Sequence, residues 1–229
     1  MVIEAIRRSF IHYGLWFHNA VDRLGLETAS ELEAEVGDSW LKSLDQRLLK
    51  ALGFNGLKGA LEGLGQKRLE ALIEVIPLSW LAQDGLWFQA IEAPFGMKTA
   101  KGLNDACMGV FSPYEALRIK RRLGLSQEPG LEGLKLALAH RLYSRINRFS
   151  VEQADGAIVY RVQTCRVQEA RRRKGLEDYP CKSAGMAEYP TFASMIDKRI
   201  KTACVACPPE PHPEDFWCAW RFELKESTP

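Results

Sequence analysis

The sequence predicts an α+β protein, in which an all-helical N-terminal region precedes a small cysteine-rich α+β domain with an antiparallel sheet. Residues 1–150 are rich in helix-forming residues and show no strand pattern. After residue 150, runs of β-branched and aromatic residues predict strands. Five of the six cysteines also fall in this last part of the chain. We therefore expect two domains, residues 1–150 and 151–229.

The helical region contains an internal repeat. A shift of 71 positions places Gly14–Phe17 on Gly85–Phe88, both with the sequence Gly-Leu-Trp-Phe, and places Gly25 on Gly96. In each copy the later glycine follows an apolar helical stripe, where a left-handed C-cap is expected. A duplicated helical unit of about 70 residues, with copies at about 10–80 and 81–150, explains this pattern.

The aromatic residues of the repeat are expected to be core. Large aromatics at helical spacing are usually buried, so we predict this for Trp16 and Trp87. Cys107 aligns with Val36 of the first copy and is therefore expected to be core as well. An aromatic-lined pocket between the copies is the alternative. The second long helix of each copy is expected to end at Gly53 and Gly124.

The C-terminal part predicts alternating strands and helices. The expected elements, in order, are a strand at 156–164, a helix at 166–174 that Gly175 ends, a helix at about 185–197, and strands at 199–204 and 216–224. Cys165 directly precedes the first of these helices. In the last strand, Cys218 shares the inward face with Trp220 and Phe222.

The cysteines predict a metal site. Cys204 and Cys207 form a Cys-x-x-Cys pair followed by two prolines, and they converge only if the chain departs from a regular strand. Four thiolates suit zinc or an iron–sulfur cluster. The candidate ligands of this metal-binding, sensor-like protein are Cys165, Cys181, Cys204, Cys207 and Cys218. Closure of the Cys-x-x-Cys pair as a disulfide, or plain burial of reduced thiols in an interaction protein, are the alternatives.

A second hypothesis is a cysteine-dependent hydrolase that acts on a C–N bond of a small heterocycle. Cys165, at a helix N-terminus and before several arginines, is the candidate nucleophile, and His212 is the candidate base. Arg171 and Arg172 belong to a basic run that is either a solvated helix face or the binding site of a small anionic ligand.

Bulk composition limits the partners and the location. A net charge of +2 gives no electrostatic argument for nucleic acid. The N-terminus lacks the apolar run of a secretion signal, and no apolar stretch reaches the roughly 18 to 20 residues of a membrane helix. We therefore expect a cytoplasmic protein with reduced thiols, no nucleic-acid partner and no membrane association.

The chain also resembles an uncharacterised family. The residues that carry the resemblance are the Gly-Leu-Trp-Phe segments, Cys165–Arg171, Pro180–Lys182, Cys204–Pro213 and Trp217–Phe222. The family comprises bacterial and archaeal cytosolic proteins with a domain of unknown function. Cys181 and the final strand are more distantly similar to 2-aminothiazoline-4-carboxylate hydrolase-like proteins and to vinyl-reductase-type small-molecule-binding domains. Both of those imply an α+β fold.

Overall fold

The computed structural model describes residues 2–52 and 56–225 and divides the chain into two compact units, residues 1–71 and 72–229. The first unit holds α1 (Val2–Leu24), α2 (Leu26–Leu52), α3 (Gly56–Glu62) and the beginning of α4 (Gln66–Leu123). Gly25, with a φ of 81°, separates α1 from α2. The Tyr13 hydroxyl of α1 donates a hydrogen bond of 3.0 Å to Glu33 of α2. Gly53, expected to end a helix, lies outside the described residues.

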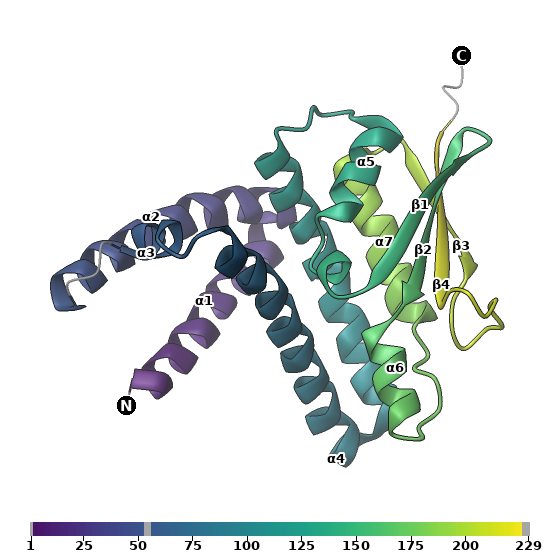
Figure 1. Ribbon diagram of the computed structural model, residues 1–229, viewed down its shortest axis with the longest axis horizontal. Coiled ribbons are helices and arrows are strands. Elements are labelled where there is room, and N and C mark those ends of the chain that lie inside the picture. Colours follow the sequence, from purple (N-terminus) through teal and green to yellow (C-terminus); the bar gives the residue numbers. More distant parts are fainter. Residues whose placement is uncertain (1, 53–55, 226–229) are drawn as a thin grey trace. The chain divides into compact units, whose positions relative to one another are not determined.

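The second unit begins with the remainder of α4, which breaks at Gly96 (φ 80°, ψ 166°). The two arms of α4 turn back on each other at this glycine (Figure 1), and Asn104 on the second arm donates to Asp84 on the first. The helices α5 (Gly130–Ala139), η1 (Tyr143–Arg145), α6 (Arg166–Arg173) and α7 (Lys182–Ile196) follow. Gly25 and Gly96 thus both join two helices with a positive φ. The duplication itself stays a prediction.

The sheet of the second unit has four antiparallel strands in the order β1-β2-β4-β3. They are β1 (Arg148–Ala154), β2 (Ala157–Thr164), β3 (Ile200–Ala206) and β4 (Cys218–Leu224). The predicted α+β class and antiparallel sheet are confirmed. The sequence analysis did not predict β1, and the change of character expected at residue 150 falls inside the second unit.

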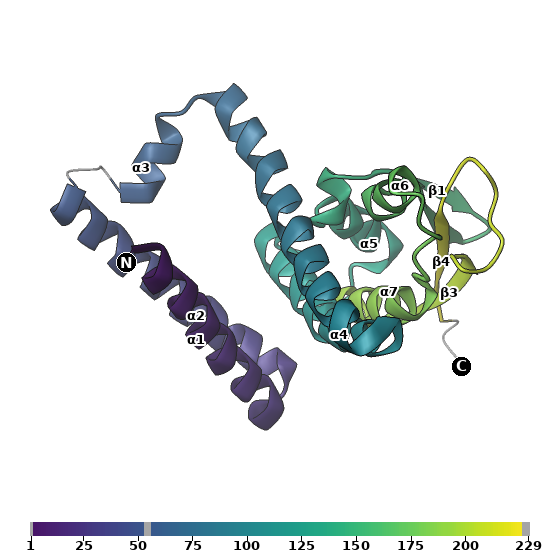
Figure 2. The ribbon, with the colours of Figure 1, turned by 90° about the horizontal axis from the view of Figure 1, so that it is seen from below.

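Helices cover one face of this sheet. In Figures 1 and 2, α5 and α7 lie on the same side of the strands, and both contact the sheet. The core between them includes Trp220, Phe222 and Phe192, each fully buried. A smaller buried cluster on the opposite face consists of Val159, Ala206, Phe216 and Ala219. The inward face predicted for β4 is therefore confirmed.

Three residues predicted to be core are on the surface. Trp16 is 70% exposed and Trp87 is 60% exposed, and Cys107 is also exposed. Consecutive residues of a helix point about 100° apart, so only one member of each Trp-Phe pair can face inward. In the second unit that member is Phe88, which packs edge-on against Tyr179 with ring centroids 5.3 Å apart.

None of the helices in the described part of the chain is both long and apolar enough to span a lipid bilayer.

Candidate functional site

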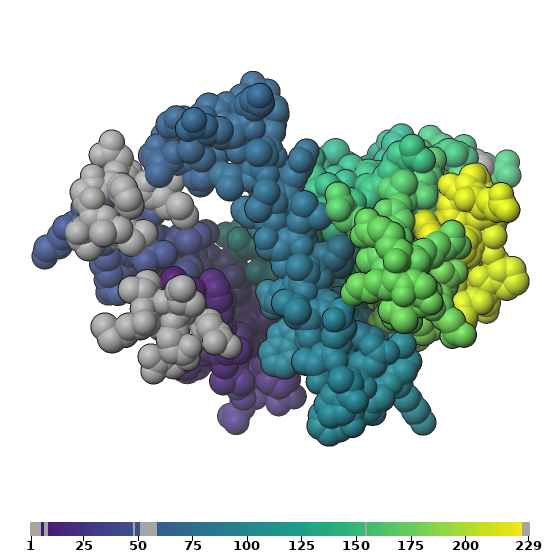
Figure 3. Space-filling model, turned by 60° about the horizontal axis from the view of Figure 1, so that its bottom comes forward, coloured from purple at the N-terminus to yellow at the C-terminus, as the bar shows by residue number. Residues whose placement is uncertain are grey.

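The second unit encloses a cavity of about 620 Å³ between α4, α6, α7 and the inner face of the sheet. Figure 3 shows the surface here, where the green segment that contains α6 lies beside the blue-green α4. The cavity is lined by aromatic rings, thiols and carboxylates. These are Phe88, Tyr143, Tyr160, Tyr179, Tyr189 and Trp220; Cys165, Cys181, Cys207 and Cys218; and Asp84, Glu92 and Glu188. A cavity of this volume fits an organic molecule of moderate size.

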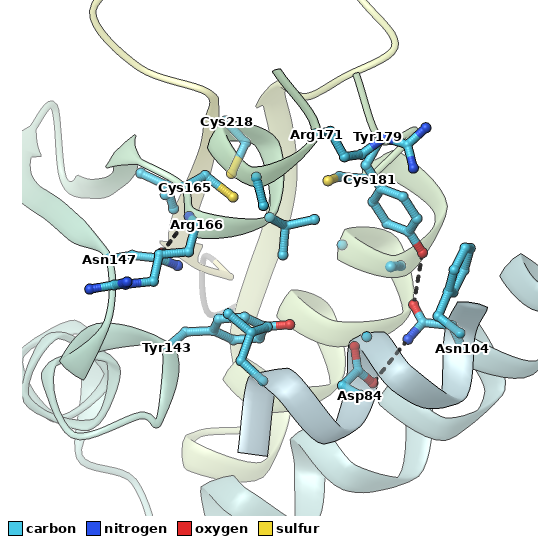
Figure 4. A pocket seen from close by; sticks show the side chains of 18 of the residues that line it. Asp84, Asn104, Tyr143, Asn147, Cys165, Arg166, Arg171, Tyr179, Cys181 and Cys218 are labelled. Carbon is cyan, nitrogen blue, oxygen red and sulfur yellow. Dashed lines mark hydrogen bonds between the residues drawn. The ribbon is translucent and has the colours of Figure 1, made fainter. Parts of the chain in front are cut away.

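Four cysteines reach the cavity from four different positions in the fold. Cys165 is the N-cap of α6, directly after β2, and Cys181 is the N-cap of α7. Cys207 follows β3, and Cys218 is the first residue of β4. Figure 4 shows the sulfurs of Cys165 and Cys218 pointing toward the same part of the cavity. We call Cys165, Cys181, Cys207 and Cys218 the thiol cluster.

A β-bulge places the Cys-x-x-Cys pair on one face of the sheet. Cys204 is opposite Trp220 and Ala206 is opposite Ala219, so Val205 is an extra residue in β3. In a regular strand, residues three apart point to opposite faces, and one inserted residue reverses that relation. Cys204 and Cys207 therefore both contact the main core. Cys207 is 1% exposed and lines the cavity, whereas Cys204 is half-buried and does not line it.

The thiols of the cluster interact electrostatically with one another. Burial raises the pKa of Cys165 and of Cys181, and the neighbouring thiols raise both further. The pKa of Cys218 lies well above its usual range, first because its thiol hydrogen-bonds with Cys207 and then because it is buried. All six pairs within the cluster are coupled in this way. At neutral pH these shifts favour the neutral thiols of Cys165, Cys181 and Cys218 over their thiolates.

Gln168 of α6 holds two walls of the cavity together. Its side chain is fully buried, and its amide donates to the Tyr179 carbonyl at 2.8 Å and to the Cys181 sulfur at 3.2 Å. The Gln168 carbonyl oxygen accepts a hydrogen bond from the Tyr179 backbone at 2.7 Å. This amide fixes the loop that precedes α7 and so sets the position of Cys181.

The helical wall of the cavity carries a chain of polar side chains, seen in Figure 4. The Tyr179 hydroxyl donates to Asn104 at 3.2 Å, and the Asn104 amide donates to Asp84 at 3.4 Å. The ammonium group of Lys101 lies 4.7 Å from the centre of the Tyr179 ring. Burial raises the pKa of Asp84. This wall therefore offers a ligand both a carboxyl group and an aromatic ring.

A buried ion cluster consists of Arg141, Glu115 and Glu188. The Arg141 side chain is 1% exposed and contacts Glu115 at 2.9 Å and Glu188 at 2.6 Å. Burial raises the pKa of Glu188, and the nearby Arg141 opposes that rise. Glu188 also lines the cavity, so one carboxyl group of this ion cluster is accessible to a molecule bound there.

The structure separates the two predicted arginines. Arg171 lines the cavity and donates to the Glu177 carbonyl at 2.6 Å. Arg172 points elsewhere, with its guanidinium 4.0 Å from the centre of the Trp217 ring. His212 lies in the loop between β3 and β4, where its ring bonds to the Pro213 carbonyl, and it does not line the cavity.

In the described ranges, no group of three histidine, cysteine, aspartate or glutamate side chains is arranged so that it could hold a metal ion. The thiol cluster is thus an open arrangement. The sequence analysis missed the buried ion cluster and Gln168, because a buried charge has no local sequence pattern. The sequence did predict the helix at about 185–197 that carries Glu188, but it did not indicate the ion pair.

Comparison with known proteins adds one match. A family of unknown function (DUF6125) matches residues 62–224. The chain belongs to this family. The matched span includes every residue that lines the cavity and all five C-terminal cysteines. Neither the curated proteins nor the solved structures provide a match.

Proposed function

We propose that this protein is a cytoplasmic, sensor-like metal-binding protein. Its thiol cluster binds zinc or an iron–sulfur cluster, and the adjoining cavity binds a small molecule. One observation carries the metal proposal: four cysteines from four separate segments line one cavity, and all six pairs interact electrostatically. Unrelated core cysteines behave as separate small hydrophobic residues, so their convergence on one cavity would not be expected.

A metal ion would reverse the electrostatics of the thiol cluster. Two thiolates repel each other, whereas a dication between them favours the deprotonated forms that bind it. Four thiolates about 2.3 Å from one zinc ion lie closer together than an open cluster, so the site must contract on binding. Cys165 and Cys181 sit at helix N-termini, and short shifts of α6 and of the loop before α7 would bring them inward. Cys204 is the fifth candidate ligand, outside the cavity.

A small molecule in the cavity would lie beside Trp220, whose buried indole nitrogen has no hydrogen-bond partner among the described residues. That nitrogen is not accessible from the cavity, so it supports no polar contact with a ligand. An anionic group of a ligand would meet Arg171 rather than Arg172, because Arg171 lines the cavity.

Metal content tests the proposal directly. We expect the protein, purified without oxygen, to contain about one zinc ion per chain without colour, or iron and sulfide with visible absorption. Cys207→Ser should remove most of that metal and lower the melting temperature, because metal binding is coupled to folding. Cys107→Ser is the matched control, since Cys107 is exposed on α4 and should leave the metal content unchanged. Metal-free wild-type protein, or full metal content in Cys207→Ser, would refute the metal site.

A cysteine-dependent hydrolase acting on a C–N bond of a small heterocycle is the second candidate. The observation in its favour is the position of Cys165 as the N-cap of α6. Burial raises the pKa of its thiol, but the backbone of Gln168 and Val167 in the first turn of the helix opposes that rise. His212 lies in the distal loop, so Glu188 or Asp84 would have to be the base. The distant resemblance to 2-aminothiazoline-4-carboxylate hydrolase-like proteins agrees with this candidate.

The rate of Cys165 alkylation at a series of pH values decides on this candidate. A nucleophilic Cys165 should react faster than the exposed Cys107 thiol at neutral pH. A lower rate for Cys165, increasing only at alkaline pH, would rule the hydrolase out.

A further inference from the structure

The buried ion cluster holds more acidic than basic groups. Arg141 is the one guanidinium, and it remains charged because arginine does not lose its proton in proteins. Two carboxyl groups share it, Glu115 at 2.9 Å and Glu188 at 2.6 Å. In the described part of the chain, no second cation is ion-paired with either glutamate. The cluster therefore has a surplus of one negative charge unless it takes up a cation or a proton.

The two glutamates are not equivalent. Glu115 uses both oxygens, because one accepts from Arg141 and the other accepts from the Leu142 backbone at 2.8 Å. Glu188 contacts Arg141 through one oxygen, and the described contacts include none to its second oxygen. Glu188 is also the member that lines the cavity. The carboxylate oxygen without a partner therefore belongs to Glu188, the member of the ion cluster that a ligand in the cavity can reach.

Aromatic rings surround this end of the cavity. Tyr143 and Tyr189 line the cavity and lie 5.9 Å and 5.5 Å from the Arg141 guanidinium. Tyr160 lies 5.8 Å from Tyr189, and Trp220 stacks on Tyr189 at 4.6 Å. Rings around a carboxylate are a common arrangement for binding organic cations, because the ring faces attract positive charge.

We propose that this end of the cavity binds the cationic nitrogen of an organic ligand, an ammonium or amidinium group, with Glu188 as its partner and the tyrosines around it. The bound cation neutralises the surplus charge of the ion cluster and takes the free oxygen of Glu188. The inference deepens the small-molecule part of the proposed function and uses none of the four thiols. The basic side chains of α6, among them Arg171, lie in another part of the same cavity wall and are free to meet an acidic group of such a ligand.

Two probes of the same shape test the charge preference. Benzamidine carries an amidinium group, and benzamide is its neutral counterpart. We expect calorimetric titration of the 229-residue chain to give benzamidine at least about tenfold tighter binding than benzamide, the size of one charge-assisted hydrogen bond. Equal affinities, or no binding of benzamidine, would overturn the inference.

Variants then locate the preference. Glu188→Gln should reduce the difference between the two probes to about twofold or less while benzamide still binds. Glu115→Gln should also reduce the difference in affinity between the two probes, because this substitution removes the surplus charge and leaves the cavity lining unchanged. If Glu188→Gln does not fold, Glu115→Gln tests the inference in its place. Glu152→Gln is the matched control, since Glu152 is exposed on β1 and does not line the cavity. A preference that persists in both Glu188→Gln and Glu115→Gln would overturn the inference.

The metal proposal can fail separately. Cys207→Ser should lose metal but keep the preference for benzamidine, because the ion cluster lies on the α7 side of the cavity and contains no cysteine. A metal-free protein that still prefers benzamidine would refute the metal site and support the cation site. A metal-loaded protein without that preference would support the metal site and refute the cation site.

Discussion

Asp197 is a single residue that joins three segments of the second unit. It caps the C-terminus of α7, and it accepts hydrogen bonds from the Gly130 backbone at the start of α5 and from the Arg199 backbone at the start of β3. The Arg199 guanidinium adds bonds of 3.0 Å and 2.7 Å. The side-chain bonds from Arg199 are the main reason that the pKa of Asp197 falls from 3.8 to about 2.

This pKa shift predicts an acid-sensitive contribution to stability. The folded protein holds Asp197 ionised, so the stabilisation is complete above the unfolded pKa of 3.8 and is lost as the pH falls toward 2. We expect it to amount to roughly 1 to 2 kcal/mol, since solvent screens the half-exposed Arg199 partner. Asp197→Asn should therefore lower the melting temperature at pH 7 and flatten the loss of stability below pH 4. Thermal melts of both proteins from pH 7 to pH 2.5 check this, and parallel acid profiles would contradict it.

The Cys-x-x-Cys pair shows what a sequence does and does not reveal about one residue. The opposite parity of Cys204 and Cys207 meant that the pair could converge only if the chain departed from a regular strand, and β3 does depart from one. It did not indicate how, and the bulge at Val205 rather than the prolines brings both residues to one face. Of the five candidate ligands, Cys218 belongs to the thiol cluster, whereas Cys204 does not line the cavity. A bulge depends on pairing with β4, so the sequence of β3 alone does not specify it.

At the scale of elements, the sequence predicted those features of helices and strands that depend on neighbouring residues. The alternation in β4 and the stop at Gly175 after α6 were read correctly, because each depends on neighbouring residues. The strand β1 was missed although Asp155 and Gly156 follow it. Both adopt positive φ (49° and 72°), and Asp-Gly is a preferred two-residue hairpin turn. This turn was the signal that would have identified β1.

The contact between α7 and β4 has no counterpart in a local pattern. A Cβ atom at Gly185 would lie 2.3 Å from the Trp220 ring, so the helix approaches the strand this closely only because residue 185 is a glycine. Trp220 and Gly185 both line the cavity, and the contact therefore sets the distance between two of its walls. The same reason explains why the buried ion cluster was not predicted. Its three charges come from α4, the segment after α5, and α7, and only the fold brings them together.

At the scale of the whole molecule, two independent divisions of the chain nearly coincide. The family match covers residues 62–224, and the second compact unit covers residues 72–229. The main hydrophobic core consists of residues between Ala116 and Phe222. Every residue that lines the cavity also lies within the second unit. The core and the candidate site are thus contained in the part of the chain that defines the family.

This containment predicts that the second part of the chain is sufficient. A chain shortened to residues 62–229 should fold with a single cooperative thermal transition, because it keeps the whole main core and all four strands. It should bind the same amount of metal per chain as the 229-residue chain and show the same preference for benzamidine over benzamide. Circular dichroism melts, elemental analysis and calorimetry measure these three properties. A broad, non-cooperative melt would show instead that residues 1–61 complete the core, and the family span would then be smaller than the folding unit.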